Sequence, residues 1–305
     1  MSESTMNSWP PILVPIITSF KDNGAVFSDG TKNVISFLYE HGITGVWLLG
    51  SYGSFPLLTN PERLAITTVA LKHAKSLGMT TIVNVGTPST ALSIELARHA
   101  ENEGADAVAA VVPFYYASTH YRSENHLAFF EEIVKSVNIP VIFYNNADAT
   151  GFSPPTTFIQ QLAEAGVAGL KDKGNLAAMS ERCQAIRANN SEAIYLSGTT
   201  SVHLQGYLVG ANGVTSGTAL ATPTLVTSLQ DALEQDNMQE AMRLQNLILK
   251  VRIAMGRYAG RAVSAYDALE KFGVEAGTCR SPWLRLSSQQ AQEVIEEIDA
   301  IAAAL

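Results

Sequence analysis

The feature that constrains this chain most is a regular alternation of short apolar runs with segments of helical character. Eight runs rich in β-branched and aliphatic residues follow one another between residues 12 and 217. They are ILVPII (12–17), GVWLLG (45–50), TTIVNVG (80–86), ADAVAAVVP (105–113), PVIFYN (140–145), VAGLKD (167–172), AIYLSG (193–198) and GVTSG (213–217). Most of them are nearly continuous in apolar residues, which is typical of parallel strands buried on both faces.

The segments between these runs have the spacing of amphipathic helices, most clearly 28–42, 60–78 and 90–104. Each of the three ends at a glycine, and we expect Ser28, Asn60 and Thr90 to cap their amino ends. Eight strand–helix units predict an α/β fold, a closed (β/α)₈ TIM barrel. An open doubly wound sheet is disfavoured, because the chain has neither a GxGxxG turn after its first strand nor a GxxxxGK[ST] loop.

The strand pattern stops near Ala221, and four helical segments follow at about 224–234, 237–256, 260–273 and 287–304. We therefore expect a catalytic barrel over residues 1–223 and a C-terminal helical region over 224–305. A chain of 305 residues, 47% of them apolar, is long enough to bury a large core.

Charge and cysteine content exclude several classes of protein. The net charge is −8 and no basic run occurs, so we expect no nucleic acid partner. Cys183 and Cys279 stand apart and lack nearby histidines, which predicts neither a disulfide framework nor a metal site. No apolar run is long enough to cross a bilayer, and the first residues do not resemble a secretion signal. We expect a soluble, cytoplasmic protein without a membrane partner.

Catalytic groups in a barrel lie at the carboxyl ends of the strands and in the loops that follow. The polar residues at these places are mostly hydroxyls, with no paired carboxylates and no histidines. They are Ser19, Ser51, Tyr52, Ser54, Thr87, Tyr115, Tyr116, Tyr144, Asn145, Lys171, Asp172, Ser197, Thr199, Thr215, Ser216 and Thr218.

Lys171 is the unusual member of this set, because it directly follows the apolar residues of its strand. Burial would lower the pKa of its amine and supply the neutral nucleophile that attacks a carbonyl. Alternatively, the strand ends one residue earlier and Lys171 extends to solvent beside Asp172. The residues alone leave both readings open.

Two further features adjoin it in the predicted barrel. Tyr144 ends the preceding strand, so its phenol could exchange protons with a substrate near Lys171, or it could simply pack in the core. The loop GSYGSFP (50–56) contains two glycines, and its backbone N–H groups could bind a small anion such as a carboxylate, or it could be an ordinary loop.

Taken together, these residues resemble the dihydrodipicolinate synthase and N-acetylneuraminate lyase superfamily of pyruvate-handling barrels. The resemblance runs nearly end to end. It rests on GSYGSFPLLTNPER (50–63), VVPFYY (111–116), FYNNADATG (143–151) and GLKD (169–172).

The resemblance implies a role for each matching residue. Lys171 would form the Schiff base, Tyr144 would shuttle protons, and Ser51 would contact the substrate carboxylate and relay protons to Tyr115. In several members this second tyrosine comes from a neighbouring subunit, which implies a homo-oligomer, a dimer or tetramer. No metal and no organic cofactor are implied. We expect Tyr52, Thr199 and Thr215 to contribute to substrate binding with Ser51.

Departures from the family pattern narrow the substrate. Ala149 stands where dihydrodipicolinate synthases carry an arginine, and Thr199 and Thr200 stand where sialic acid lyases carry an acidic pair. The loop at Tyr52 and Ser54 is closest to that of 4-hydroxy-2-oxoglutarate aldolases. Asp148 and Lys173 are unusual at their positions, either as substrate contacts or as a solvated pair.

The leading hypothesis is therefore a class I aldolase that cleaves a short 2-oxo-4-hydroxy acid to pyruvate and an aldehyde. The alternatives are a hydro-lyase, either like dihydrodipicolinate synthase or acting on a 2-oxo-3-deoxy sugar acid, and a barrel that binds a 2-oxo acid without turnover.

Overall fold

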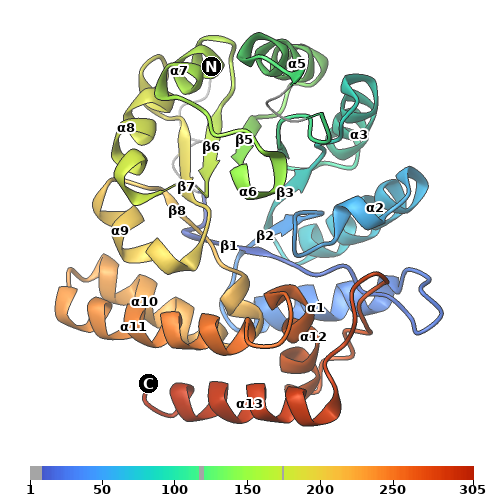
Figure 1. Cartoon of the computed structure of the whole chain (residues 1–305), viewed down its shortest axis with the longest axis vertical. Helices are drawn as coiled ribbons and strands as arrows, with labels where there is room; N and C mark the ends of the chain where they lie inside the picture. Colours follow the sequence, from blue (N-terminus) through green and yellow to red (C-terminus); the bar gives the residue numbers. More distant parts are fainter. Residues whose placement is uncertain (1–8, 117–119, 174) are drawn as a thin grey trace. The chain divides into compact units, whose positions relative to one another are not determined.

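The strands form a closed parallel barrel in the order β1 to β8, as the alternation predicts (Figure 1). The computed structural model describes residues 9–116, 120–173 and 175–305. The strands are β1 Ile12–Pro15, β2 Gly45–Leu48, β3 Thr80–Asn84, β4 Ala107–Ala110, β5 Val141–Asn145, β6 Gly169–Asp172, β7 Ile194–Ser197 and β8 Gly213–Thr215. Nearly every strand residue is buried, which explains why the runs are continuously apolar.

Helices alternate with the strands and continue after β8. They are α1 Ser28–Glu40, α2 Asn60–Ser76, α3 Thr90–Asn102, α5 Ser123–Ser136, α6 Ala147–Thr150, α7 Thr156–Glu164, α8 Leu176–Arg187, α9 His203–Leu208, α10 Pro223–Glu234, α11 Met238–Met255, α12 Arg261–Lys271 and α13 Ser288–Ala302, with short 3₁₀ turns η1 Phe55–Leu57, η2 Thr200–Val202 and η3 Gly217–Leu220. The four predicted C-terminal helices are confirmed.

The N-cap residues lie one position before the predicted caps, because the three helices begin at Ser28, Asn60 and Thr90 themselves. Thr59 caps α2, because its hydroxyl accepts from the Glu62 N–H while the Glu62 carboxylate accepts from the Thr59 N–H. Ser89 caps α3 in the same position, whereas Phe27 precedes α1 without a side-chain cap. The predicted glycine ends are confirmed, since Gly42, Gly78 and Gly104 all have positive φ.

The chain consists of two compact units. The first contains Thr81–Thr215 with the segment that ends at Pro11, and the second contains Ile12–Thr80 and Ser216–Leu305. A chain of edge-to-face rings, from Phe130 through Phe143 and Phe158 to Phe152, fills part of the core of the first unit. The domain boundary at residue 223 stays a prediction.

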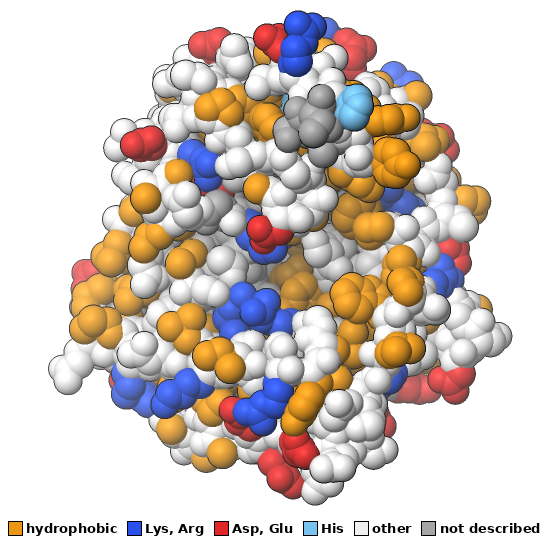
Figure 2. Space-filling view, in the orientation of Figure 1, with side chains coloured by type: hydrophobic (Ala, Val, Ile, Leu, Met, Phe, Trp, Pro, Cys, Tyr) orange, Lys and Arg blue, Asp and Glu red, His pale blue; other side chains and the backbone are white. Residues whose placement is uncertain are grey.

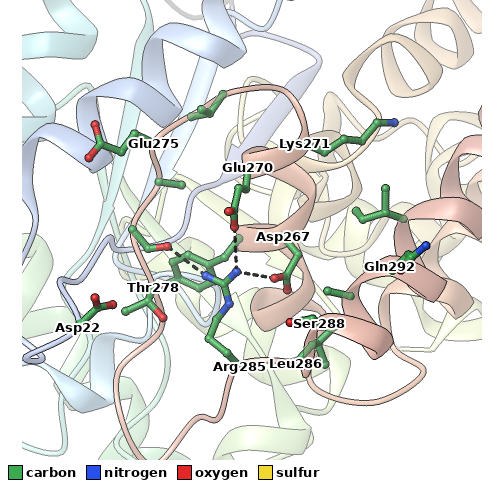
Figure 3. Close-up of a pocket in the computed structure, with 16 residues that line it drawn as sticks. Asp22, Asp267, Glu270, Lys271, Glu275, Thr278, Arg285, Leu286, Ser288 and Gln292 are labelled. Carbon is green, nitrogen blue, oxygen red and sulfur yellow. Dashed lines mark hydrogen bonds and ion pairs between the residues drawn. The ribbon is translucent and has the colours of Figure 1, made fainter.

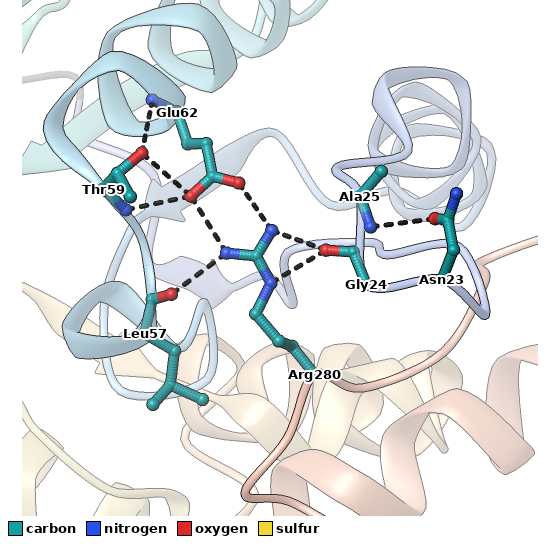
Figure 4. Close-up of polar contacts among 7 residues, drawn as sticks. All are labelled: Asn23, Gly24, Ala25, Leu57, Thr59, Glu62 and Arg280. Carbon is teal, nitrogen blue, oxygen red and sulfur yellow. Dashed lines mark hydrogen bonds and ion pairs between the residues drawn. The ribbon is translucent and has the colours of Figure 1, made fainter.

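In the second unit, the C-terminal segment is hydrogen-bonded to the loops of the first strands (Figure 4). Arg280, after α12, donates to the carbonyls of Gly24 and Leu57 and pairs with Glu62 of α2 at 2.5 Å. The Tyr266 hydroxyl of α12 donates to the Thr18 carbonyl at 2.6 Å. These bonds fix the C-terminal helices to the segments that follow β1 and β2.

Two features are absent from the described residues. No helix among them is long and apolar enough to span a membrane. They also contain no group of three or more histidine, cysteine, aspartate or glutamate side chains placed to hold a metal ion.

Candidate active site

Lys171 lies in the middle of β6 and is buried, with 3% of its surface exposed. The strand does not end before it, so the alternative in which Lys171 extends to solvent is wrong. β6 pairs in parallel with β5, and this register sets Lys171 opposite Tyr144. The Lys171 Nζ lies 4.1 Å from the centre of the Tyr144 ring. The structure thus brings the two predicted residues into contact.

The surroundings of Lys171 favour its neutral amine. Burial lowers its pKa well below the usual value, because a charged ammonium loses solvation inside the barrel, and the positive charge of Lys173 lowers it further. A neutral amine is the form that attacks a carbonyl carbon. Lys171 therefore has the burial and the lowered pKa that its predicted Schiff-base role requires.

The Tyr144 hydroxyl belongs to a polar chain that leads to the surface. Tyr144 is 4% exposed, and its hydroxyl accepts from the Asn146 side-chain amide at 3.4 Å. Lys173 donates to the Asn146 side-chain oxygen at 3.3 Å and to Asp148 at 3.2 Å. Sequence reasoning missed Asn146, although its place one residue after β5 is a signal of the same kind as that of Tyr144.

Asp148 and Lys173 form an ion pair at the exposed end of this chain. Their side chains are 85% and 37% exposed. Of the two alternatives that the sequence left open for these residues, this exposure favours the solvated ion pair. The pair still has a link to the candidate site, since Asn146 connects Lys173 to the Tyr144 hydroxyl.

Asp172, next to Lys171, anchors the strand from its other face. Its carboxylate accepts from Asn145 at 2.7 Å, from the Tyr195 hydroxyl at 2.9 Å and from Arg182 of α8 at 3.3 Å. Successive residues of a strand face opposite sides, so the Asp172 carboxylate meets α8 while Lys171 faces Tyr144. This network holds β6 in register beneath Lys171, and Arg182 and Tyr195 could not be linked to it from the sequence.

The two threonines that are predicted to bind substrate already form hydrogen bonds through their hydroxyl groups within the first unit. Thr215 is buried and donates to the Ser197 carbonyl at 3.3 Å. The Thr199 hydroxyl caps η2, where it accepts from the Ser201 N–H at 3.4 Å. To bind a substrate, each hydroxyl would have to form a further hydrogen bond or exchange the present one. The role of Thr199 and Thr215 in substrate binding stays a prediction.

The loop after β2 belongs to the second unit and forms a tight turn. The Ser54 N–H donates to the Ser51 carbonyl at 3.2 Å, and Ser54 has a positive φ of 51°. The Thr18 hydroxyl donates to the Gly53 carbonyl at 2.7 Å. Ser51 is exposed at the start of this turn, whereas the ring of Tyr52 packs inward. The place of Ser51 and Tyr52 beside Lys171 stays a prediction.

Tyr115 lies in the loop after β4 with an unusual backbone and an unusual exposure. Its φ is 90°, a strained value for a residue with a side chain, and 84% of its surface is exposed. Its ring contacts Tyr116 edge-on, with 5.2 Å between the centroids. Such exposure leaves the phenol available to another molecule, and its predicted catalytic role is untested.

Comparison with known proteins gives a family and a fold. The family model described as the dihydrodipicolinate synthetase family matches residues 10–301. An uncharacterised DapA-like lyase of Halobacterium salinarum is 31% identical over 272 residues, which cover 89% of this chain and 87% of that protein. A 2-dehydro-3-deoxy-D-gluconate/2-dehydro-3-deoxy-phosphogluconate aldolase of Thermoproteus tenax is 28% identical and covers 92% and 91%.

Among solved structures, YagE of Escherichia coli K12, a protein of the dihydrodipicolinic acid synthase family in complex with pyruvate, superimposes with a TM-score of 0.89. The identity is 22%, and the match covers 96% of this chain and 98% of that one. At this identity the likeness is one of fold.

Proposed function

Because the chain belongs to the dihydrodipicolinate synthetase family, we propose that it is a lyase whose Lys171 forms a Schiff base with a 2-oxo acid. The observation that carries this proposal is the buried Lys171 amine, held 4.1 Å from the centre of the Tyr144 ring with its pKa lowered by burial. Membership of a family that includes aldolases favours an enzyme over a non-catalytic binding protein.

The proposed reaction is the cleavage of a short 2-oxo-4-hydroxy acid. The Lys171 amine attacks C2, and the carbonyl oxygen leaves as water to give an iminium ion. Loss of the C4 hydroxyl proton then breaks the bond between C3 and C4, and the iminium accepts the electron pair as an enamine. The aldehyde departs, C3 is protonated, and hydrolysis returns pyruvate and free Lys171. Tyr144 is the group proposed to move these protons.

The remaining predicted residues take supporting roles in this proposal. The Ser51 hydroxyl and the backbone N–H groups of the loop at Tyr52 would hold the substrate carboxylate. Tyr115 would join a proton relay across the subunits of a homo-oligomer, for which its exposure is suitable. Thr199 and Thr215 would contact the substrate tail. The chemistry requires no metal and no organic cofactor.

Ala149 favours the aldolase over an enzyme that condenses pyruvate with a second carboxylate-bearing substrate. A side chain of one methyl group cannot form the bidentate carboxylate contact that an arginine forms at this place. The hydro-lyase alternative shares the same iminium and differs only in the bond that breaks.

Product analysis tests the proposal. We expect purified protein incubated with 2-oxo-4-hydroxy acids to release pyruvate and an aldehyde in equal amounts, and Lys171→Met to release neither. Formation of a dehydrated 2-oxo acid without pyruvate would favour the hydro-lyase. Light scattering tests the oligomer, for which we propose a dimer or a tetramer, and cell fractionation tests the proposed cytoplasmic location.

A further inference from the structure

The Tyr52 side chain occupies a space that exists because residue 217 is glycine. A Cβ atom on Gly217 would lie 2.3 Å from the Tyr52 Cζ and 2.6 Å from its hydroxyl oxygen, which is closer than real atoms approach. Gly217 begins η3, and η3 packs against α11 and α12. The phenol thus points from the loop after β2 toward the start of η3.

The Tyr52 hydroxyl is buried there and has no hydrogen-bond partner within the described part of the chain. A buried hydroxyl is rarely left unsatisfied in a folded protein, because it loses its bonds to water and gains none in exchange. A ligand atom that accepts a hydrogen bond would remove this deficit.

Two arginines bring positive charge to the same hydroxyl. Arg252, near the end of α11, and Arg261, at the start of α12, both act electrostatically on Tyr52 and oppose the rise in its pKa that burial causes. Arg261 also donates to the Arg252 carbonyl at 3.1 Å. Figure 2 shows Lys and Arg side chains gathered over this part of α11 and the turn that follows.

Neither guanidinium forms an ion pair with any carboxylate that the structure describes. Arg252 is partly buried, and burial together with the charge of Arg261 lowers its pKa. Two guanidinium groups near a buried hydroxyl donor, unpaired with any described carboxylate, are the kind of groups that bind an anion in proteins.

The large pocket between α12 and α13 offers a contrast within the same unit (Figure 3). This cavity of about 820 Å³ also contains an arginine, Arg285. Its guanidinium already pairs with Asp267 and with Glu270, the latter at 3.3 Å. An anion would compete there with two internal carboxylates, whereas Arg252 and Arg261 pair with none of the carboxylates in residues 9–116, 120–173 and 175–305.

We propose that the Tyr52 hydroxyl, Arg252 and Arg261 bind one oxyanionic group, a carboxylate or a phosphate, within the second unit. The hydroxyl would donate a hydrogen bond to an oxygen of this group, and the two guanidinium groups would supply its counter-charge. This anion site is additional to the proposed lyase function and does not rest on it.

Binding of simple anions tests the site without reference to catalysis. We expect one inorganic phosphate or one malonate to bind per chain in isothermal titration, and Arg252→Met and Arg261→Met each to weaken binding by about tenfold or more. The probe that binds more tightly identifies the anion as phosphate or carboxylate. Tyr52→Phe removes only the hydroxyl and should weaken binding less.

Arg257→Met is the matched control, since Arg257 lies between the two arginines in the chain and already pairs with Glu297 at 2.5 Å. We expect it to bind the anion as the wild type does. Equal binding by wild type and both Arg252→Met and Arg261→Met, or no binding to wild type, would overturn the site. Thermal melting of each variant shows whether it is folded.

Discussion

Two buried charges of this protein, Asp172 in the first unit and Arg252 in the second, have opposite surroundings. In the first unit, the Asp172 carboxylate is surrounded by Asn145, Tyr195 and Arg182, which together supply hydrogen bonds and a counter-charge. In the second unit, Arg252 is partly buried and lies near Arg261. Neither of these arginines forms an ion pair with a carboxylate among the described residues. A charge with internal partners holds the fold together, and a charge without them is available to a ligand.

Lys171 is the extreme case in the first unit, because burial lowers the pKa of its amine well below the usual value. We expect Lys171→Met to lower kcat/KM by about 10⁴-fold or more, since the covalent route is lost. Stability should not fall, because Met fills a similar volume without a desolvated amine. Lys135→Met, at an exposed lysine paired with glutamates, is the control. Turnover retained by Lys171→Met would contradict the covalent mechanism.

Matched arginine variants test whether a buried charge with an internal partner contributes more to stability than one without such a partner. Arg182→Met leaves the Asp172 carboxylate buried without its cation, which should cost about 3 kcal/mol or more of unfolding free energy. Arg252→Met removes a charge without an internal counter-charge and should change that free energy by less than about 1 kcal/mol. Urea unfolding of both variants measures the difference, and similar losses would erase the distinction.

The ion pair of Glu62 and Arg280 gives the second unit an internally satisfied charge of its own (Figure 4). The hydrogen bond that Arg280 donates to the Glu62 carboxylate lowers the pKa of Glu62 to about 2, below the ordinary value of 4.5. The stabilisation is therefore present above pH 4.5 and is lost as the pH falls from there toward 2.

We expect this pH-dependent contribution to be about 1 to 2 kcal/mol, because solvent near the pair screens it. Unfolding measured between pH 2 and 6 should show a decline in wild type that is reduced in Arg280→Met. An identical decline in both proteins would mean that other carboxylates account for it.

The smallest expected effect is a shift in the pH profile of imine formation when Lys173 is replaced. The positive charge of Lys173 lowers the pKa of Lys171, so Lys173→Met should raise that pKa and shift the profile toward higher pH. The rate of imine formation with pyruvate, followed from pH 5 to 10, measures the shift. A shift toward lower pH would contradict the electrostatic role of Lys173.

The sequence was sufficient to predict the barrel, because strands buried on both faces must be continuously apolar. The caps were predicted one residue late, since Thr59 and Asn60 are both capping residues and only backbone geometry distinguishes them. Lys171 and Tyr144 could be predicted as neighbours, because equivalent ends of adjacent parallel strands lie side by side.

The contacts that could not be predicted join residues from separate elements without any periodic signal. Arg182 and Tyr195 reach Asp172 from α8 and β7. Tyr52 lies against Gly217, which is distant in the chain. The position of Tyr52 in the sequence predicted a substrate contact, but it gave no sign of Arg252 and Arg261 near the phenol. Such contacts depend on side-chain directions that a sequence does not contain.

Reduction with borohydride in the presence of pyruvate, followed by peptide mass spectrometry, tests the Schiff-base role of Lys171 directly. We expect one reduced pyruvyl group per chain, attached to Lys171, and no labelling in Lys171→Met. A chain that remains unlabelled, or that is labelled at another lysine, would contradict the Schiff-base role of Lys171.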